Sequence, residues 1–358
     1  MKVLYDFQAF EMQRIGGISR YFSILMEKLP DYGINSMLPI IGSNNLYIKG
    51  KYDSSIFSFV KNPDRFNRKY TRYLLPFLKY DIVHPTYYNP YILKYKRKSV
   101  PMVATVHDFI HERFSSNFPD SEKILRWKRT ICSSADRLIA ISESTKRDLI
   151  DFLGVEENRI DVVYHGIMWN DKLLSQPVVL PFSGEYLLFV GDRSVKYKNF
   201  EEFVIGVSPV VRQYSISIVC TGRPFSESER ELLKKYGVDK NACSIMANEN
   251  ELLWLYQNAI CFVYPSKYEG FGLPILEAFG AKCPILLSRA SCFPEIAGGA
   301  AEYYELGSPD SLAASLTAIL DDRAKREAMK KAGTERLRFF TLDKMIENTV
   351  NVYRKTIG

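Results

Sequence analysis

The chain has 358 residues, of which 46% are hydrophobic and 25% are charged, a composition typical of a soluble globular protein and a length that suits two hydrophobic cores. Its first residues form too short an apolar run for a signal peptide, and no stretch approaches about 18 uninterrupted apolar residues, so we expect a cytoplasmic protein without a transmembrane helix. The formal net charge of +7 belongs to residues 1–170, which hold 25 Lys and Arg against 18 Asp and Glu, whereas residues 171–358 hold 23 of each.

The sequence offers no pattern of metal ligands. Its six cysteines show no C-x-x-C spacing and its four histidines are scattered, so a zinc cluster is not expected. There is also no Asp-x-Asp pair, which would support a metal-clamped diphosphate. We therefore expect reduced thiols and no metal ion.

The chain begins with a short strand over residues 3–6, followed by a loop that contains Gly16 and Gly17 and by a helix that starts near Ser19. The dinucleotide signature G-x-G-x-x-G is absent, which disfavours a nicotinamide enzyme. Gly16 and Gly17 could still present backbone amides to a diphosphate, and a simple tight turn is the alternative.

Residues 61–98 are basic and rich in tyrosine, with ten Lys or Arg, two Asp and seven Tyr. This composition is typical of a surface that contacts an anionic membrane or of a nucleic-acid groove. A solvated basic face without a ligand is an equally good interpretation.

Two apolar strands, expected over residues 82–84 and 102–108, each carry a histidine at or near the carboxyl end. Catalytic residues of open α/β sheets tend to lie at the carboxyl edge of the sheet, and His107 fits this position. The alternative is a core histidine whose ring nitrogens are hydrogen-bonded within the protein. Further elements of the first half are expected over residues 137–142, 142–153 and 160–166. Strands that alternate with helices predict a parallel sheet covered on both faces.

Residues 167–184 have little periodicity, and we place the interdomain linker there. A second α/β unit follows, with strands expected over 186–191, 216–222, 259–264 and 284–287 and helices over 199–211, 250–257 and 309–320. Residues 341–357 carry apolar side chains at helical spacing. This last helix either crosses back onto the first domain or packs within the second.

The stretch over residues 263–277 has the pattern of a strand, a glycine turn and a helix start. Gly270 and Gly272 let the backbone approach a ligand, and free N–H groups at the start of a helix favour anions. Glu269 in the turn and Glu277 in the helix would accept hydrogen bonds from hydroxyl groups. The combination predicts a ligand with phosphates and hydroxyls, such as a nucleotide sugar; a turn with surface glutamates is the alternative.

Three segments carry a resemblance to a known family. The E-x7-E motif runs from Glu269 to Glu277, V-G-D-R-S-V-K-Y-K-N covers residues 190–199, and S-C-F-P-E-I-A-G covers residues 291–298. With these segments the chain resembles, over nearly its whole length, the retaining glycosyltransferases of the GT4 family. The resemblance implies an α/β fold of the GT-B type, in which two Rossmann-like domains face each other across a cleft.

The implied domains have separate tasks. We expect an acceptor-binding domain over residues 1–170 and a nucleotide-sugar-binding domain over residues 171–340. The helix over residues 341–358 would pack back on the N-terminal domain.

The resemblance also implies roles for single residues. Arg193 and Lys198 would neutralise the diphosphate of the leaving group, although Lys196 leaves the choice of lysine open. Glu269 would contact the donor sugar and Glu277 the ribose hydroxyls. From the first domain, His107 would contact the transferred sugar. The other expected donor-binding residues are Gly16, Gly17, Gly270, Phe271, Gly272 and Leu273.

The implied reaction is a metal-independent and cofactor-independent transfer of a hexose with retention, by front-side attack. The sequences of these motifs resemble those of mannosyltransferases of bacterial polysaccharide and O-antigen synthesis. This resemblance favours GDP-mannose as the donor. The expected acceptor is a glycan on a lipid, at the anionic inner face of the cytoplasmic membrane, and no nucleic-acid partner is expected. A sugar-nucleotide epimerase of similar fold and a non-catalytic sugar-nucleotide-binding protein are the alternatives.

Overall fold

The computed structural model describes residues 1–52, 64–169 and 173–358. The chain forms two compact units, one made of Met1–Tyr164 together with Asp343–Gly358 and the other of His165–Leu342. The predicted boundary between residues 170 and 171 lies outside the described residues, as do residues 61–63 of the basic segment.

The first unit contains two parallel sheets among its described residues, each of three strands. One has the order β2-β1-β3, with β1 at Lys2–Leu4, β2 at Asn35–Met37 and β3 at Ile82–Val83. The other has the order β4-β5-β6, with β4 at Val103–Val106, β5 at Arg137–Ala140 and β6 at Ile160–Val162. An isolated parallel bridge joins Val83 to Met102.

Eight α-helices of the described chain belong wholly or mainly to this unit. They are α1 (Gln8–Met12), α2 (Gly17–Lys28), α3 (Asp64–Leu74), α4 (Tyr91–Tyr95), α5 (Ile110–Arg113), α6 (Ser121–Ser134), α7 (Glu143–Leu153) and α15 (Leu342–Ile357). Helix α7 shows how the sequence sets its limits. The Ser142 side chain caps its start by accepting the Thr145 N–H, and Gly154 ends it at φ 65°, in the left-handed region.

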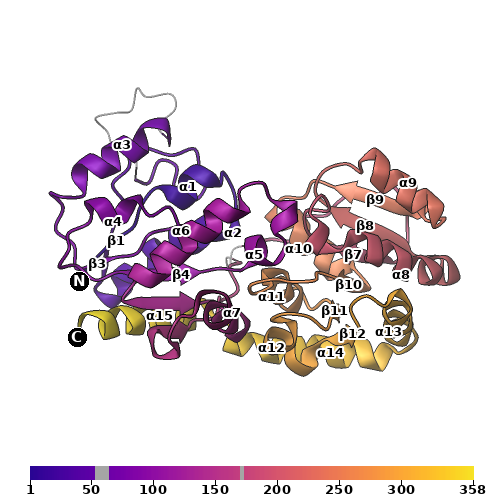
Figure 1. Ribbon diagram of the computed structural model, residues 1–358. Coiled ribbons are helices and arrows are strands. Elements are labelled where there is room, and N and C mark those ends of the chain that lie inside the picture. The colour runs from indigo at the N-terminus through magenta and orange to yellow at the C-terminus, as the bar shows by residue number, and fades with distance from the viewer. Residues whose placement is uncertain (53–63, 170–172) are drawn as a thin grey trace. The chain divides into compact units, whose positions relative to one another are not determined.

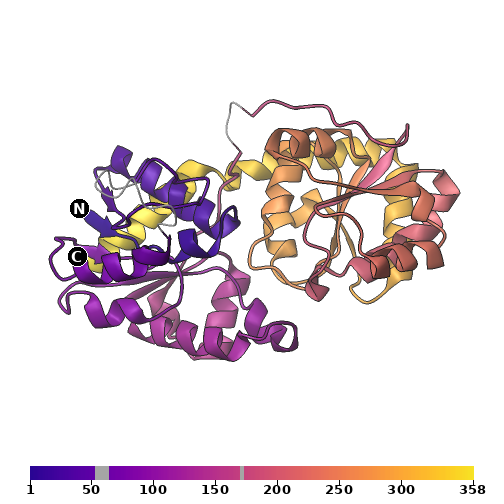
Figure 2. The same ribbon diagram turned by 90° about the horizontal axis from the view of Figure 1, so that it is seen from above.

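The C-terminal helix α15 packs into the core of the first unit, beside the strands of the N-terminal part (Figures 1 and 2). The hydroxyl of Tyr353 lies 2.8 Å from that of Tyr5 and 2.7 Å from Nδ1 of His84, and all three side chains are buried. The other ring nitrogen of His84 lies 2.9 Å from Oγ1 of Thr105. His84 is therefore a hydrogen-bonded core histidine.

The second unit is built on a parallel sheet of six described strands in the order β12-β11-β10-β7-β8-β9 (Figure 1). The strands are β7 (Tyr186–Phe189), β8 (Ser217–Thr221), β9 (Ala242–Ile245), β10 (Cys261–Tyr264), β11 (Ile285–Ser288) and β12 (Glu302–Tyr304). The helices are α8 (Phe200–Tyr214), α9 (Glu227–Lys235), α10 (Glu249–Asn258), α11 (Leu273–Gly280), α12 (Phe293–Ala297), α13 (Pro309–Asp321) and α14 (Arg323–Arg336). Side chains of β7, β8, α8 and α13 share one core.

The parallel sheets and the alternation of strands with helices confirm the predicted α/β class. Strands β9 and β12 were not predicted. They are the two edge strands of the second sheet, and their side chains are mostly half-buried. Edge strands of this kind lack the continuous apolar run by which a buried parallel strand is recognised.

Candidate active site

The turn between β10 and α11 builds the centre of the site. Strand β10 is fully buried between β7 and β11, so its carboxyl end is a fixed point from which the turn starts. Gly272 precedes α11 at φ 85°, and a Cβ atom there would lie 3.1 Å from the Phe293 ring. A side chain at Gly272 would therefore strain the backbone and crowd this ring. The turn holds Glu269 before the helix and Glu277 within it.

The backbone of Glu269 is hydrogen-bonded to the segment after β11. Ser291 Oγ donates to the Glu269 carbonyl at 2.6 Å, and the Glu269 N–H lies 3.4 Å from the same Oγ. Cys292 Sγ lies 3.2 Å from that carbonyl oxygen. Ser291 has φ 51°, an uncommon conformation for a residue with a side chain. The S-x-x-P-E segment therefore helps to fix the position of Glu269.

The side chain of Glu269 is paired with Lys198. The two charged groups are 2.6 Å apart, and the side chains are only 14% (Lys198) and 12% (Glu269) exposed. Lys198 Nζ also lies 3.4 Å from the Tyr264 hydroxyl. Burial, together with the charge of Glu269, raises the pKa of Tyr264, so this hydroxyl stays protonated.

Lys196, the other candidate lysine, has an exposed side chain. It lines a second hollow of ≈ 530 Å³, which Arg193 and Glu229 also line. Of the two lysines, it is Lys198 that the structure brings to the E-x7-E turn.

Glu277 has a neutral partner. The hydroxyl of Tyr256 donates to Glu277 Oε2 at 3.2 Å. Burial, together with the nearby charge of Glu277, raises the pKa of Tyr256 and keeps it a hydrogen-bond donor. Phe271, between the two glutamates, is buried and lies edge-on to the His165 ring at 5.1 Å. One glutamate thus faces an ammonium group and the other a phenol.

Arg193 is held tightly within the second unit. Its side chain is 1% exposed; Nε donates to Glu229 Oε1 at 3.1 Å, Nη1 donates to the Thr221 carbonyl at 2.8 Å, and Nη2 donates to the Arg223 carbonyl. Three of the five N–H groups of the guanidinium are thus engaged. The sequence predicted Arg193 but not its partner Glu229. Ser226 and Glu229 have the spacing of a capping box, which indicates the start of α9 but not the pairing of Glu229 with Arg193.

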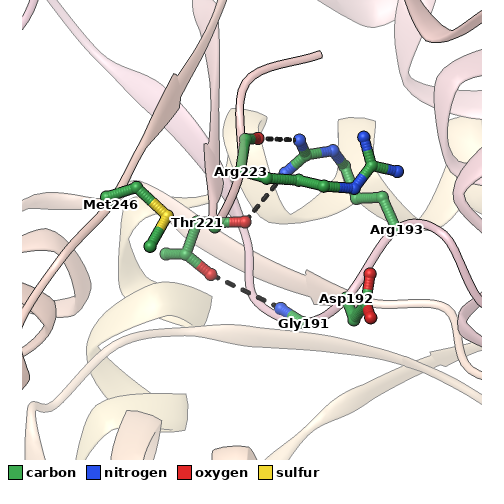
Figure 3. Close-up of a pocket in the computed structure, with 7 residues that line it drawn as sticks. Gly191, Asp192, Arg193, Thr221, Arg223 and Met246 are labelled. Atoms are coloured by element: carbon green, nitrogen blue, oxygen red, sulfur yellow. Dashed lines mark hydrogen bonds between the residues drawn. The ribbon is translucent and has the colours of Figure 1, made fainter. Parts of the chain in front are cut away.

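A hollow of ≈ 310 Å³ adjoins Arg193 (Figure 3). Figure 3 shows the side chains of Arg193 and Arg223 running close to each other, with Met246 on another side of the hollow. Its lining residues are Gly191, Asp192, Arg193, Thr221, Gly222, Arg223 and Met246. Thr221 ends β8, next to β7, so the hollow lies at the carboxyl edge of the sheet, where ligands of such folds bind.

His107, Gly16 and Gly17 belong to the first unit. His107 directly follows β4 and is buried, with its ring edge-on to Tyr21 at 5.4 Å. Gly16 directly precedes α2, and the Gln13 side chain accepts the Ser19 N–H of the first helical turn at 3.0 Å. One of the backbone N–H groups near this glycine loop is therefore already hydrogen-bonded to Gln13.

The loop after His107 is folded around a buried ammonium group that the sequence did not reveal. Lys128 Nζ donates to the Asp108 carbonyl at 2.7 Å and lies 2.8 Å from Glu112 Oε1, with both charged side chains 1% exposed. In the sequence, Lys128 is one of several basic residues in an amphipathic helix and resembles a surface lysine. Its pairing joins two distant segments, so nothing local predicts it.

The described residues contain neither a cluster of metal ligands nor a helix that could span a membrane. No group of three or more His, Cys, Asp or Glu side chains within them is arranged to hold a metal ion. Within the same residues, no helix combines the length and apolarity needed to cross a membrane.

Comparisons with known proteins match both units. The family of group 1 glycosyl transferases matches residues 174–336, and glycosyltransferase family 4 matches residues 15–168. The MMP alpha-(1->4)-mannosyltransferase of Mycolicibacterium hassiacum is 26% identical over 298 residues, which cover 78% of this chain and 71% of that protein. O-antigen chain mannosyltransferase B of Escherichia coli is 35% identical over 106 residues, 30% of this chain and 28% of that protein.

Among solved structures, Anabaena HepE in complex with UDP-glucose is similar with a TM-score of 0.73, at 15% identity and with 99% of this chain and 100% of that chain covered. This likeness concerns the fold, which is the GT-B fold. The two family matches follow each other along nearly the whole sequence, so the chain is a glycosyltransferase of the group 1 and family 4 type.

Proposed function

We propose that the protein transfers a hexose, with mannose favoured, from a nucleoside diphosphate sugar to a glycan acceptor, with retention of configuration and without a metal ion. The observation that carries this proposal is the Lys198–Glu269 pair on the turn that also leads to Glu277. An ammonium group suits a phosphate and two carboxylates suit sugar hydroxyls, so the turn and the lysine that contacts it together offer the chemistry that a nucleotide sugar requires.

The site residues divide the work. Lys198 and Arg193 neutralise the negative charge that develops on the departing diphosphate. Glu269 accepts hydrogen bonds from the transferred sugar, and Glu277 accepts them from the ribose. From the first unit, His107 contacts the transferred sugar. The residues that bring backbone amides or packing surfaces to the donor are Gly16, Gly17, Gly270, Phe271, Gly272 and Leu273.

The proposed chemistry is a front-side displacement. The acceptor oxygen forms a bond to the anomeric carbon on the face from which the diphosphate leaves, and the departing phosphate oxygen takes the proton of the acceptor hydroxyl. The protein contributes position and charge to a transition state with oxocarbenium character.

The names of the mannosyltransferase relatives support mannose as the transferred sugar, and we propose GDP-mannose as the donor. A thermal-shift series with GDP-, UDP- and TDP-sugars tests this, because a ligand that binds only the folded state raises its stability with log concentration. We expect the largest shift with GDP-mannose, followed by transfer of mannose to a lipid-linked saccharide. Isomerisation of the donor in the absence of acceptor would instead indicate an epimerase, and binding without any reaction would indicate a non-catalytic protein.

We also propose that the first unit attaches peripherally to an anionic membrane, at the inner face of the cytoplasmic membrane, where a lipid-linked acceptor would be found. The support comes from α3 and the residues just after it. The inward side of α3 is polar, with Asn67 and Thr71 buried and hydrogen-bonded to backbone groups. The exposed aromatic side chains are Phe66 (49%), Tyr73 (72%) and Phe77 (72%). Aromatic rings among Arg and Lys side chains suit a membrane interface.

A further inference from the structure

Glu229 is the common partner of two guanidinium groups beside the ≈ 310 Å³ hollow. Its carboxylate accepts hydrogen bonds from Arg193 Nε at 3.1 Å and from Arg223 Nη1 and Nη2 at 3.1 and 3.3 Å. The Ser226 N–H donates to the same carboxylate at 2.6 Å. Burial alone would raise the pKa of Glu229, but the Ser226 N–H and the two arginine charges lower it, so the carboxylate stays ionised.

The two arginines differ in what they can offer a ligand. Arg193 is 1% exposed and engages three acceptors of the protein, whereas the Arg223 side chain is 42% exposed and is fixed by Glu229 through one edge of its guanidinium. A planar group that is held in place by a carboxylate loses little entropy when it binds. Arg193 can act on a nearby diphosphate through its charge, whereas Arg223 is the guanidinium with exposed N–H groups that can donate to a base in this hollow.

The rest of the lining suits a flat heterocycle better than a second phosphate. Met246 is 74% exposed and gives the hollow a polarizable apolar wall. Asp192 lies close enough for the Arg223 charge to act on it. Although partial burial raises its pKa, hydrogen bonds from Ser194 and the arginine charges lower it overall, so Asp192 stays an anion. A carboxylate repels phosphate but accepts N–H groups of a base.

The hollow also lies next to Lys198, the proposed phosphate contact. Gly191 lines the hollow and lies against Lys198, since a Cβ atom on Gly191 would be 3.8 Å from Lys198 Nζ. A donor whose diphosphate meets Lys198 can therefore place its nucleoside in the hollow.

We infer that Arg223 is a specificity residue that reads a guanine base, donating to O6 and N7 of the base while Asp192 accepts its N–H groups. Guanine offers two adjacent acceptors to a guanidinium, whereas uracil offers one carbonyl at the corresponding edge. Glu229 is the positioning residue that orients Arg223. This inference rests on the proposed function, because it assumes a nucleoside diphosphate donor.

The test compares the dissociation constants of GDP and UDP, measured by calorimetry, for the wild type and for Arg223→Ala, Arg223→Lys and Lys234→Ala. Lys234 is exposed on α9 and does not line the hollow, so it controls for loss of one positive charge on the same unit. We expect the wild type to prefer GDP. Both Arg223 variants should bind GDP about tenfold or more weakly, with UDP affinity nearly unchanged, since a lysine lacks the fork that meets two acceptors.

Two outcomes would overturn this inference while leaving the proposed function intact: equal losses of GDP and UDP affinity, which would make Arg223 a phosphate contact, and a wild-type preference for UDP. Binding of neither nucleotide to the wild type would contradict the proposed function itself. Thermal unfolding of each variant, which needs no ligand, shows whether the second unit is still folded.

Discussion

The ammonium group of Lys198 lies 2.6 Å from a carboxylate oxygen of Glu269, in a place where both side chains are nearly buried. Each charge is thus satisfied before a donor arrives. A diphosphate that takes over Lys198 would release Glu269 for sugar hydroxyls, so the pair keeps both groups charged and in position without an unpaired charge in a poorly solvated site.

Breaking this pair from one side should destabilise the second unit. Lys198→Met leaves the Glu269 carboxylate without its cation, and Glu269→Gln leaves the ammonium group without its anion. We expect each change to lower the free energy of unfolding by about 1 kcal/mol or more. The double variant should lose less than the sum of the two losses, because it leaves no unpaired charge. Urea denaturation measures this, and additive losses would mean that the pair is not coupled.

The two glutamates of the turn should differ in kinetics. Glu277 is proposed to bind the ribose, which is equally bound in the ground state and the transition state, so Glu277→Ala should chiefly raise KM for the donor. Glu269 is proposed to contact the transferred sugar, so Glu269→Ala should chiefly lower kcat. Steady-state kinetics with varied donor tests the division, and the same pattern of KM and kcat changes in both variants would show it to be wrong.

Stability of the first unit should fall in mild acid because of His84. Burial lowers the pKa of His84 from 6.5 to about 3, so the folded state keeps the ring neutral. Above about pH 6.5 both states carry a neutral ring and His84 has no effect. As the pH falls toward 3, the unfolded chain gains a proton that the folded chain does not, and stability falls by up to about 1.4 kcal/mol per pH unit.

A His84→Gln variant should therefore lose less stability than the wild type between about pH 6.5 and pH 5, even if it is less stable at neutral pH. The midpoint of thermal unfolding across this range is the measurement. His165 in the second unit has a similarly lowered pKa of about 3 and is left unchanged, so its contribution is common to both proteins. Parallel pH profiles for wild type and variant would contradict this assignment.

Membrane attachment should depend on the exposed aromatic residues near α3. Replacing Phe66, Tyr73 and Phe77 by Ser should lower flotation with vesicles that contain anionic phospholipid, because these rings would enter the interface. Neutralising Lys94, Lys96, Arg97 and Lys98 should lower it further and make it insensitive to salt. Phe339→Ser is a matched control, since Phe339 is 59% exposed on the second unit. Equal flotation of the wild type and both sets of variants would refute the attachment.

Local patterns predicted much of the fold and part of the site. The turn from β10 to α11 follows from an apolar run, two glycines and a helix start, all within one short segment. Pairings between distant segments could not be predicted this way. Neither the pairing of Arg193 with Glu229 nor that of Lys128 with Glu112 has a signature in the spacing of a single sequence. Ser291 belongs to the S-x-x-P-E segment that the sequence revealed. Its hydrogen bond to the Glu269 carbonyl, however, forms only because β10 and β11 lie side by side.

The central claim is that Lys198 and Arg193 stabilise the departing diphosphate, and the most direct test is turnover at saturating donor. We predict that Lys198→Ala and Arg193→Ala each lower kcat by about 10² or more, the scale of losing one charge-stabilising donor in the transition state. Lys234→Ala, which removes an exposed charge from the same unit, should leave kcat unchanged. Turnover close to that of the wild type in both the Lys198 and the Arg193 variants would contradict the account.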